Sequence, residues 1–199
     1  TLVGATLAET RLKAWAAQAT PMLLLGANAP DIDAVTMLIE RDLSLGFRRG
    51  WTHGILALIV LPILLTALIV LGDRVIAKLR GREPTAQSKP LFALAVIAVL
   101  THPVLDWLNT YGMRFLMPFD GTWFYGDALF VVDPWVWLLT AMTVVLGHTS
   151  TRLSIVGWVI LGLVTTSLIT GFDGVPAATR FVWCAGIIGI VWLRTTGHW

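Results

Sequence analysis

Long apolar stretches without a charged residue alternate with short polar connections along this chain. A helix needs about 20 apolar residues to cross the hydrocarbon core of a bilayer, and several of these stretches reach or approach that length. The pattern predicts transmembrane helices over residues 51–72, 91–111, 129–147 and 154–171, and a shorter one over 181–193. We expect a break in the second of these at Pro103, because proline removes a backbone donor.

The first part of the chain has a weaker pattern. Residues 1–19 predict one mildly amphipathic helix, and the apolar run 21–29 is too short to span a bilayer alone. We therefore predict an all-α, polytopic transmembrane bundle that forms a single domain over 1–199, with a short re-entrant or half-spanning N-terminal segment. The chain opens inside an apolar pattern and ends without a natural stop, so we expect both termini to be incomplete.

The composition supports a membrane protein and excludes several other classes. Hydrophobic residues make up 56% of the chain and charged residues 13%, whereas an ordinary globular domain carries about 25% charged residues. The net charge of +2, without a basic stripe, argues against a nucleic-acid partner. A single cysteine, Cys184, excludes an intramolecular disulfide and a cysteine zinc site.

The distribution of Lys and Arg predicts the orientation in the membrane. Nine of the 14 cations fall on the side of the connection 73–90, and this side should be cytoplasmic because positive charge is retained there. The other five, on the predicted periplasmic side, are Arg41, Arg48, Arg49, Arg114 and Arg180.

Histidine and aspartate residues converge on this second side of the membrane, in the leaflet that we predict to be the outer one. Polar residues at membrane depth are rare and usually functional. His102 and Asp106 are four residues apart, so both project from one helical face, and Asp31 and Asp33 follow the short apolar run in what we expect to be a loop. With His53 they offer imidazole nitrogen and carboxylate oxygen, a donor set suited to zinc, with manganese or magnesium as alternatives.

Each residue also has a structural alternative. His102 and Asp106 could form a hydrogen-bonded pair between helices without a metal, and His53 could be solvated. Asp31 or Asp33 could cap a short helix running to Glu40. Asp133, a candidate general base, precedes Pro134 in the manner of a helix N-cap.

Other polar and aromatic residues near the same interface could contact a substrate. The guanidinium groups of Arg48 and Arg49 are suited to phosphate or carboxylate, although they could equally anchor anionic headgroups. The connections 109–112, with Asn109 and Tyr111, and 119–127 predict a lid or substrate rim, or an aromatic belt at the interface.

The motifs occur in an order that resembles a known family. Ala-Pro-Asp-Ile-Asp at 29–33, Arg-Gly-Trp-Thr-His at 49–53, Thr-His-Pro-x-x-Asp at 101–106 and Asp-Pro-Trp at 133–135 are similar to the YdjM-like inner-membrane metal-dependent hydrolases of bacteria. The resemblance implies a membrane-embedded hydrolase whose Asp and His residues bind metal. It also implies one further histidine just before Thr1, and a histidine in many members where this chain has Arg48.

Together these patterns favour a metal-dependent hydrolase acting on a lipid or lipid-linked phosphate or ester near the outer leaflet. We expect Asp31, Asp33, His53, His102 and Asp106 as metal ligands, and Arg49 as a clamp for developing negative charge. The alternatives are a divalent-metal or proton transporter that uses the same cluster, and a structural membrane subunit. A transporter should continue its polar residues toward the cytoplasmic side, where the sequence has few.

Overall fold

The computed structural model of the chain describes residues 2–38, 47–130, 133–148 and 150–197, and no strand occurs among them. This confirms the predicted all-α fold class. Contacts divide the chain into two compact units, Thr1–Asp133 and Pro134–Trp199, which are described separately. The single domain predicted from the sequence stays a prediction.

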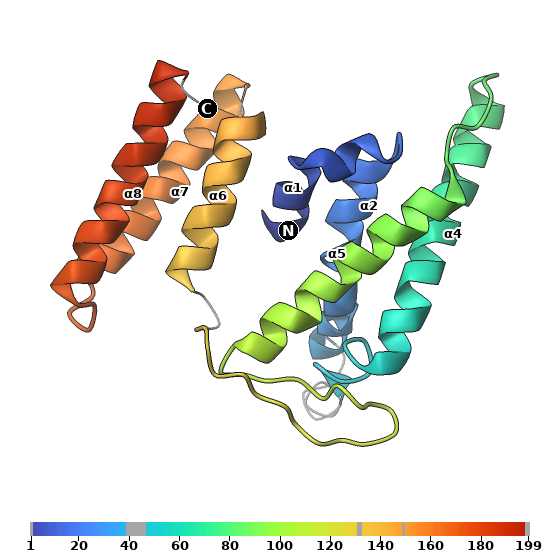
Figure 1. Ribbon diagram of the computed structural model, residues 1–199, viewed down its shortest axis with the longest axis horizontal. Coiled ribbons are helices and arrows are strands. Elements are labelled where there is room, and N and C mark those ends of the chain that lie inside the picture. The colour runs from blue at the N-terminus through green and yellow to red at the C-terminus, as the bar shows by residue number, and fades with distance from the viewer. Residues whose placement is uncertain (1, 39–46, 131–132, 149, 198–199) are drawn as a thin grey trace. The chain divides into compact units, whose positions relative to one another are not determined.

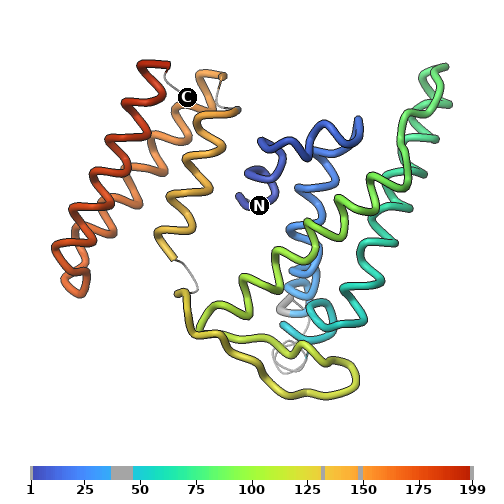
Figure 2. The backbone as a smooth tube through the Cα atoms, in the orientation of Figure 1, coloured from blue at the N-terminus to red at the C-terminus, as the bar shows by residue number. Residues whose placement is uncertain are grey.

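The first unit is built around a hairpin of two long helices. Its elements are α1 (Leu2–Ala8), the 3₁₀ helices η1 (Arg11–Ala14) and η2 (Ala29–Leu38), α2 (Ala19–Gly26), α4 (Ile55–Leu79) and α5 (Ser88–Leu108). Helix α5 packs against both α4 and α2 (Figure 1). After α5 the chain runs as an extended loop past the beginning of α4, where the N–H of Ile55 donates to the carbonyl of Phe115 at 2.8 Å (Figure 2).

The core of this unit is a tightly packed apolar cluster where α2 meets α5. Met22 and Leu23 of α2 and Leu94 of α5 are completely buried. Gly26 allows the two backbones to approach, because a Cβ atom placed on it would lie 2.6 Å from the Cβ of Ala98. Small residues at such crossings are typical of helices that associate within membranes.

Two helix predictions in this unit are wrong. Residues 1–19 form α1 and η1 instead of one helix, because the Thr10 hydroxyl donates to the Leu7 carbonyl and accepts from the Leu12 N–H, which offers the backbone an alternative to helical bonds. Helix α5 continues through Pro103 without the expected break. Proline there removes one backbone donor, and the remaining helical bonds and the packing on α2 and α4 keep the helix intact.

At the end remote from the loop, a buried carboxylate of α4 holds the connection that leads to α5. Asp73 of α4 accepts hydrogen bonds from the Arg82 guanidinium and from the backbone N–H groups of Thr85 and Ala86. These bonds hold the connection between the helices closed over their ends.

The second unit contains α6 (Pro134–His148), α7 (Arg152–Gly171) and α8 (Ala177–Thr196). Helix α8 packs against both α6 and α7. The buried Trp183 of α8 donates its indole N–H to the hydroxyl of Thr166 in α7 at 3.0 Å. Its helices begin within five residues of the predicted spans 129–147, 154–171 and 181–193.

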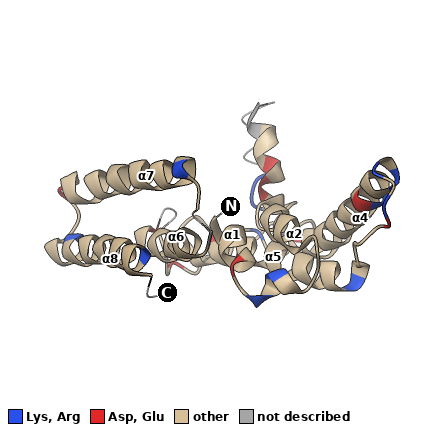
Figure 3. Cartoon of the chain, turned by 90° about the horizontal axis from the view of Figure 1, so that it is seen from above, with Lys and Arg blue, Asp and Glu red and all other residues tan. Residues whose placement is uncertain are grey.

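Four of the described helices, α4, α5, α7 and α8, are long and apolar enough to cross a membrane, and α6 is a shorter apolar helix. Figure 3 shows the helices largely free of charged residues, with Lys and Arg of α7 and α8 toward their ends. The exposed faces of these helices are apolar, as expected for helices surrounded by lipid.

The close approach at Gly26 yields a prediction about stability. Replacing Gly26 by leucine should lower the free energy of unfolding by about 1–3 kcal/mol, because an overpacked contact forces neighbouring groups apart. Gly72→Leu is the matched control, since nothing lies within 4 Å of a Cβ atom at that position of α4. Unfolding of the purified protein in detergent measures both, and equal stability of the two variants would contradict the packing described here.

Candidate metal centre

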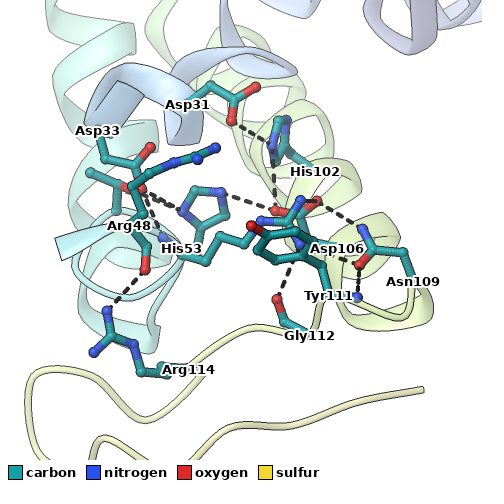
Figure 4. Close-up of polar contacts among 12 residues, drawn as sticks. Asp31, Asp33, Arg48, His53, His102, Asp106, Asn109, Tyr111, Gly112 and Arg114 are labelled. Atoms are coloured by element: carbon teal, nitrogen blue, oxygen red, sulfur yellow. Dashed lines mark hydrogen bonds and ion pairs between the residues drawn. The ribbon is translucent and has the colours of Figure 1, made fainter. Parts of the chain in front are cut away.

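Five residues predicted as ligands come from three separate segments of the first unit and meet in one place (Figure 4). Asp31 and Asp33 lie on η2, His53 lies in the turn before α4, and His102 and Asp106 lie on α5. The structure therefore confirms that the five cluster in space, while their role as ligands stays a prediction.

The two carboxylates of η2 point to different partners. This segment is a 3₁₀ helix instead of the expected loop, and with three residues per turn two side chains that are two positions apart cannot share a face. Asp31 Oδ1 lies 3.3 Å from His102 Nε2, whereas Asp33 Oδ2 lies 3.4 Å from His53 Nδ1. The alternative of a short helix running to Glu40 matches η2 as far as Leu38, with Asp31 and Asp33 inside the helix, and its end at Glu40 is outside the described residues.

The two candidate ligands on α5 lie on one helical face, as their spacing predicts. His102 and Asp106 are one turn apart on the same face, and their Nε2 and Oδ2 atoms are 3.7 Å apart. Asn109, which caps the end of the helix, donates from Nδ2 to Asp106 Oδ1 at 3.4 Å. Asp106 thus has one oxygen held by neighbours and one turned toward the histidines.

The hydrogen bonds determine which nitrogen of each imidazole carries the proton. The Thr52 hydroxyl donates to Asp33 Oδ2, so its 3.0 Å contact with His53 Nδ1 requires the proton on that nitrogen. His102 Nδ1 lies 2.9 Å from the carbonyl oxygen of Ala27, which can only accept. A neutral ring held in this way would carry its lone pair on Nε2, the arrangement that histidine ligands normally show.

These free lone pairs face one another and the carboxylates. His53 Nε2 lies 3.2 Å from Asp106 Oδ2, yet neither atom has a hydrogen-bond partner although both are buried. Among the described residues, ligand atoms of Asp31, His53 and His102 lie within 4.8 Å of one another. Buried acceptors that converge without donors are costly, and a bound cation would satisfy them.

The donor set fits a divalent metal. His53 Nε2, His102 Nε2, Asp31 Oδ1 and Asp106 Oδ2 offer two nitrogens and two oxygens, which suits zinc, while manganese and magnesium favour more oxygen ligands. Asp33 stands behind His53 in this arrangement and orients the ring through Nδ1. The ligand role predicted for Asp33 stays a prediction, but its Oδ2 atom is already engaged by three donors.

The environment of the two η2 carboxylates favours their charged forms. Burial by itself raises the pKa of Asp33, but hydrogen bonds from His53, the Arg49 N–H and Thr52 outweigh it and bring the pKa below its usual value. The close contact between Asp31 Oδ1 and His102 Nε2 likewise lowers the pKa of Asp31. Both groups are therefore anionic at neutral pH, as metal binding requires.

Arg49 connects the parts of the site. Its backbone adopts a left-handed conformation with φ of 52°, and its N–H donates to Asp33 Oδ2 at 2.9 Å. Its guanidinium donates to Asn109 Oδ1 and Gly112 O, pairs with Asp106 Oδ1 at 3.3 Å and lies 4.4 Å above the centre of the Tyr111 ring. These bonds direct the guanidinium fork toward the protein, and the clamp role predicted for Arg49 stays untested.

Arg48 is placed differently from its neighbour. Its carbonyl accepts a hydrogen bond from the Arg114 guanidinium at 2.9 Å, while its own Nε atom is buried without a hydrogen-bond partner. In Figure 4 the Arg48 side chain extends past Asp33 toward the side of Asp31 and His102. It is therefore a cationic group near the cluster with unused donor capacity.

The remaining predicted residues have separate positions. Asn109 accepts the Tyr111 N–H at 2.7 Å and the Arg49 guanidinium at 3.2 Å, so Asn109 and Tyr111 support Arg49 from the rim of the site. Asp133 directly precedes Pro134, the first residue of α6, which matches the predicted N-cap position. It lies at the boundary between the two units, and its role as a general base stays a prediction.

Sequence reasoning did not assign the groups that orient the site. Thr52 directly precedes His53 in the chain, and threonine hydroxyls often form hydrogen bonds with nearby groups, so this residue could have been found from the sequence. The carbonyl groups of Ala27 and Gly112 carry no signal in the sequence, because every residue has a carbonyl. Contacts through the backbone emerge only from the fold.

The fold and the cluster define a polytopic helical membrane protein with a His/Asp centre, buried at His53 and exposed at Asp31, near one end of its first helix hairpin. A family model described as YdjM inner membrane protein matches residues 1–177, and the chain belongs to this family. The chain is also similar to "Uncharacterized protein YfhP" of Bacillus subtilis (strain 168), with 28% identity over 115 residues. That match covers 58% of this chain but only 32% of the relative, and no solved structure matches.

The convergence of lone pairs predicts metal content. His53→Ala and His102→Ala should each lose most of the metal that the purified protein carries, because each removes a nitrogen ligand. His148→Ala, at the end of α6, is the control and should keep it. Elemental analysis after purification measures the ion-to-protein ratio. Full retention in the first two variants would reject the site.

The position of Asp33 predicts a smaller effect from its replacement. Asp33→Asn should weaken metal affinity by about 10–100-fold, the usual cost of losing the group behind a ligating histidine. Asp106→Asn removes a ligand oxygen and should abolish measurable binding. Competition with a chromogenic chelator compares the two affinities. If Asp33→Asn is as severe as Asp106→Asn, Asp33 is itself a ligand.

Proposed function

We propose that this protein is a metal-dependent hydrolase that acts on a lipid-linked phosphate ester at the periplasmic leaflet of the bacterial inner membrane. The main support is the pair of buried, unpartnered acceptors, His53 Nε2 and Asp106 Oδ2, beside the His102 imidazole. Buried polar atoms normally have partners, so their convergence supports the proposal of a cation at this site.

The location of the site supports a substrate that resides in the membrane. His102 and Asp106 lie in a helix with the length and composition of a membrane span, close to its end. That end lies opposite the connection 80–87, whose cations favour the cytoplasmic side. A substrate held in the leaflet by its own apolar chain would present its headgroup at this depth.

The charge of the site supports a phosphate group. Arg48 brings a guanidinium with unused donors to a cluster whose carboxylates a metal would neutralise. Guanidinium groups bind phosphate oxygens through paired, charge-assisted hydrogen bonds. An anionic substrate would therefore satisfy the buried Nε atom of Arg48.

In the proposed reaction, different residues of the chain would have different roles. A bound divalent ion would supply a water of lowered pKa and polarise the scissile bond. Thr52, which donates to Asp33, holds one imidazole in a single tautomer, and the Ala27 carbonyl holds the other. Arg49 with Asn109 holds the Asp106 carboxylate in place. Arg48 would bind and orient the phosphate, and Asp133 remains our candidate to receive the proton of the attacking water.

A transporter would use the same cluster, but the packing beside it favours an enzyme. Transport requires a polar path from the site across the hairpin. Toward the connection 80–87, the described residues at the α2–α5 contact form an apolar cluster that includes Leu91, Leu94, Ala95 and Ala98, all fully buried. A site closed from this side suits a reaction that begins and ends in one leaflet.

The experiment that tests the proposal is release of phosphate from phosphatidic acid in mixed micelles. We expect turnover that chelation with EDTA abolishes and that zinc or manganese restores. Arg48→Gln should raise the KM by at least tenfold with metal content unchanged, whereas Arg49→Gln should also lower metal affinity, because it releases Asp106. Metal-loaded protein that hydrolyses no lipid phosphate, but carries metal across proteoliposome membranes, would establish the transporter instead.

A further inference from the structure

An apolar groove of about 250 Å³ lies beside the metal centre in the first unit. Its wall on α5 consists of Leu100, Pro103, Val104 and Trp107, spaced as one face of a helix. The polar residues His102 and Asp106 occupy the neighbouring face of the same turns. The groove and the centre are therefore side by side at the same depth in the membrane.

The other walls come from the elements that also carry the polar site. Leu58 lies in the first turn of α4, five residues after His53. Met113, Phe115 and Phe124 belong to the extended loop that follows α5. Met113 directly follows Gly112, whose carbonyl holds Arg49. Every side chain lining the groove is apolar, in contrast to the charged cluster next to it.

The groove opens sideways toward the surroundings of the helices. Val104 is 48% exposed and Trp107 45%, while Pro103 and Met113 are buried and form the base. Val104 lies about 24 Å along α5 from Ser88 at 1.5 Å per residue, which places it in the far half of a hydrocarbon core about 30 Å thick. Hydrocarbon chains therefore surround the opening.

We propose that this groove binds the apolar chain of the substrate, with the headgroup directed to the metal centre. The volume decides how much of a ligand it takes, since sites that enclose a whole small molecule measure about 300–1,000 Å³. A groove of about 250 Å³ fits a segment of one acyl or prenyl chain. The proposal rests on the proposed function for the identity of the ligand as a substrate, and it makes this protein an enzyme that selects its lipid by the chain as well as by the phosphate.

The same turns of α5 present a polar face and an apolar face, which suit the headgroup and the chain of an amphiphile. Residues 102 and 103, and again 106 and 107, are consecutive, so their side chains diverge by about 100° around the helix. A lipid lying against α5 in this leaflet would therefore meet the polar face with its headgroup and the apolar face with its chain. Arg49 and Tyr111, close to Gly112, mark the boundary between the two.

The test uses phosphatidic acid that carries a photoreactive diazirine in its acyl chain, added to the full chain in detergent micelles. Mass spectrometry should locate the labelled residues mainly in 100–107 and 113–124. Val104→Trp fills the opening and should reduce this labelling about tenfold, or about 1.4 kcal/mol of binding. Val75→Trp is the matched control, because Val75 is an exposed valine near the other end of α4. Leu58→Trp fills the groove from α4 and serves as a second variant, with metal content and melting temperature reporting that each variant folds.

The outcomes separate this inference from the proposed function. Labelling requires no turnover, so the metal-deficient His102→Ala protein should still be labelled in the groove. Groove labelling without any hydrolysis would uphold the groove and reject the enzyme. Even labelling along α4 and α5, labelling insensitive to Val104→Trp, or capture of a second protein chain at these residues would overturn the groove while leaving hydrolysis unaffected.

Discussion

One carboxylate oxygen, Oδ2 of Asp33, organises the candidate metal centre of this protein. It accepts hydrogen bonds from the Arg49 N–H and the Thr52 hydroxyl, each at 2.9 Å, and lies 3.4 Å from His53 Nδ1. These contacts fix η2 against the turn before α4 and leave the Nε2 atom of His53 facing α5. They also hold Arg49 in a left-handed conformation, which ordinarily costs about 1–2 kcal/mol for a residue other than glycine. From that position its guanidinium reaches Asp106, Asn109 and Gly112, so one oxygen positions both sides of the cluster.

This arrangement gives neighbouring arginines different roles. Arg49 has its backbone and its guanidinium engaged by the protein, and we regard it as the residue that positions Asp106. Arg48, one residue earlier, keeps a buried Nε atom without a partner. Two adjacent residues point in different directions where the backbone turns, and the left-handed conformation of Arg49 produces that turn here. A charge pattern alone could not show that the protein engages the Arg49 guanidinium while Arg48 keeps an unpartnered Nε atom.

Much of the fold and the membership of the site were predictable from the sequence, for separate physical reasons. The length of the apolar stretches predicted the long helices, because a helix must be about 20 residues long to cross a bilayer. The shared face of His102 and Asp106 follows from helix geometry. The prediction of a break at Pro103 was wrong because the packing of α5 on two neighbouring helices outweighs the loss of one backbone hydrogen bond. The prediction of one helix over 1–19 was wrong because the Thr10 hydroxyl competes with the backbone for hydrogen bonds. The divergence of Asp31 from Asp33 depends on a 3₁₀ helix that their spacing does not reveal. The tautomers of both histidines depend on partners, a carbonyl of Ala27 among them, that only the folded chain brings together.

The packing of small residues determines from where the centre can be reached. Gly26 allows α2 to approach α5 closely, and Ala95 and Ala98 at their contact are completely buried. The turns of α5 that follow this apolar contact have two different faces. One face carries His102 and Asp106, and the other lines the groove. In the proposed function, a ligand would reach the centre past the loop or sideways through the groove. Both routes would suit the amphiphilic, membrane-resident substrate that we propose.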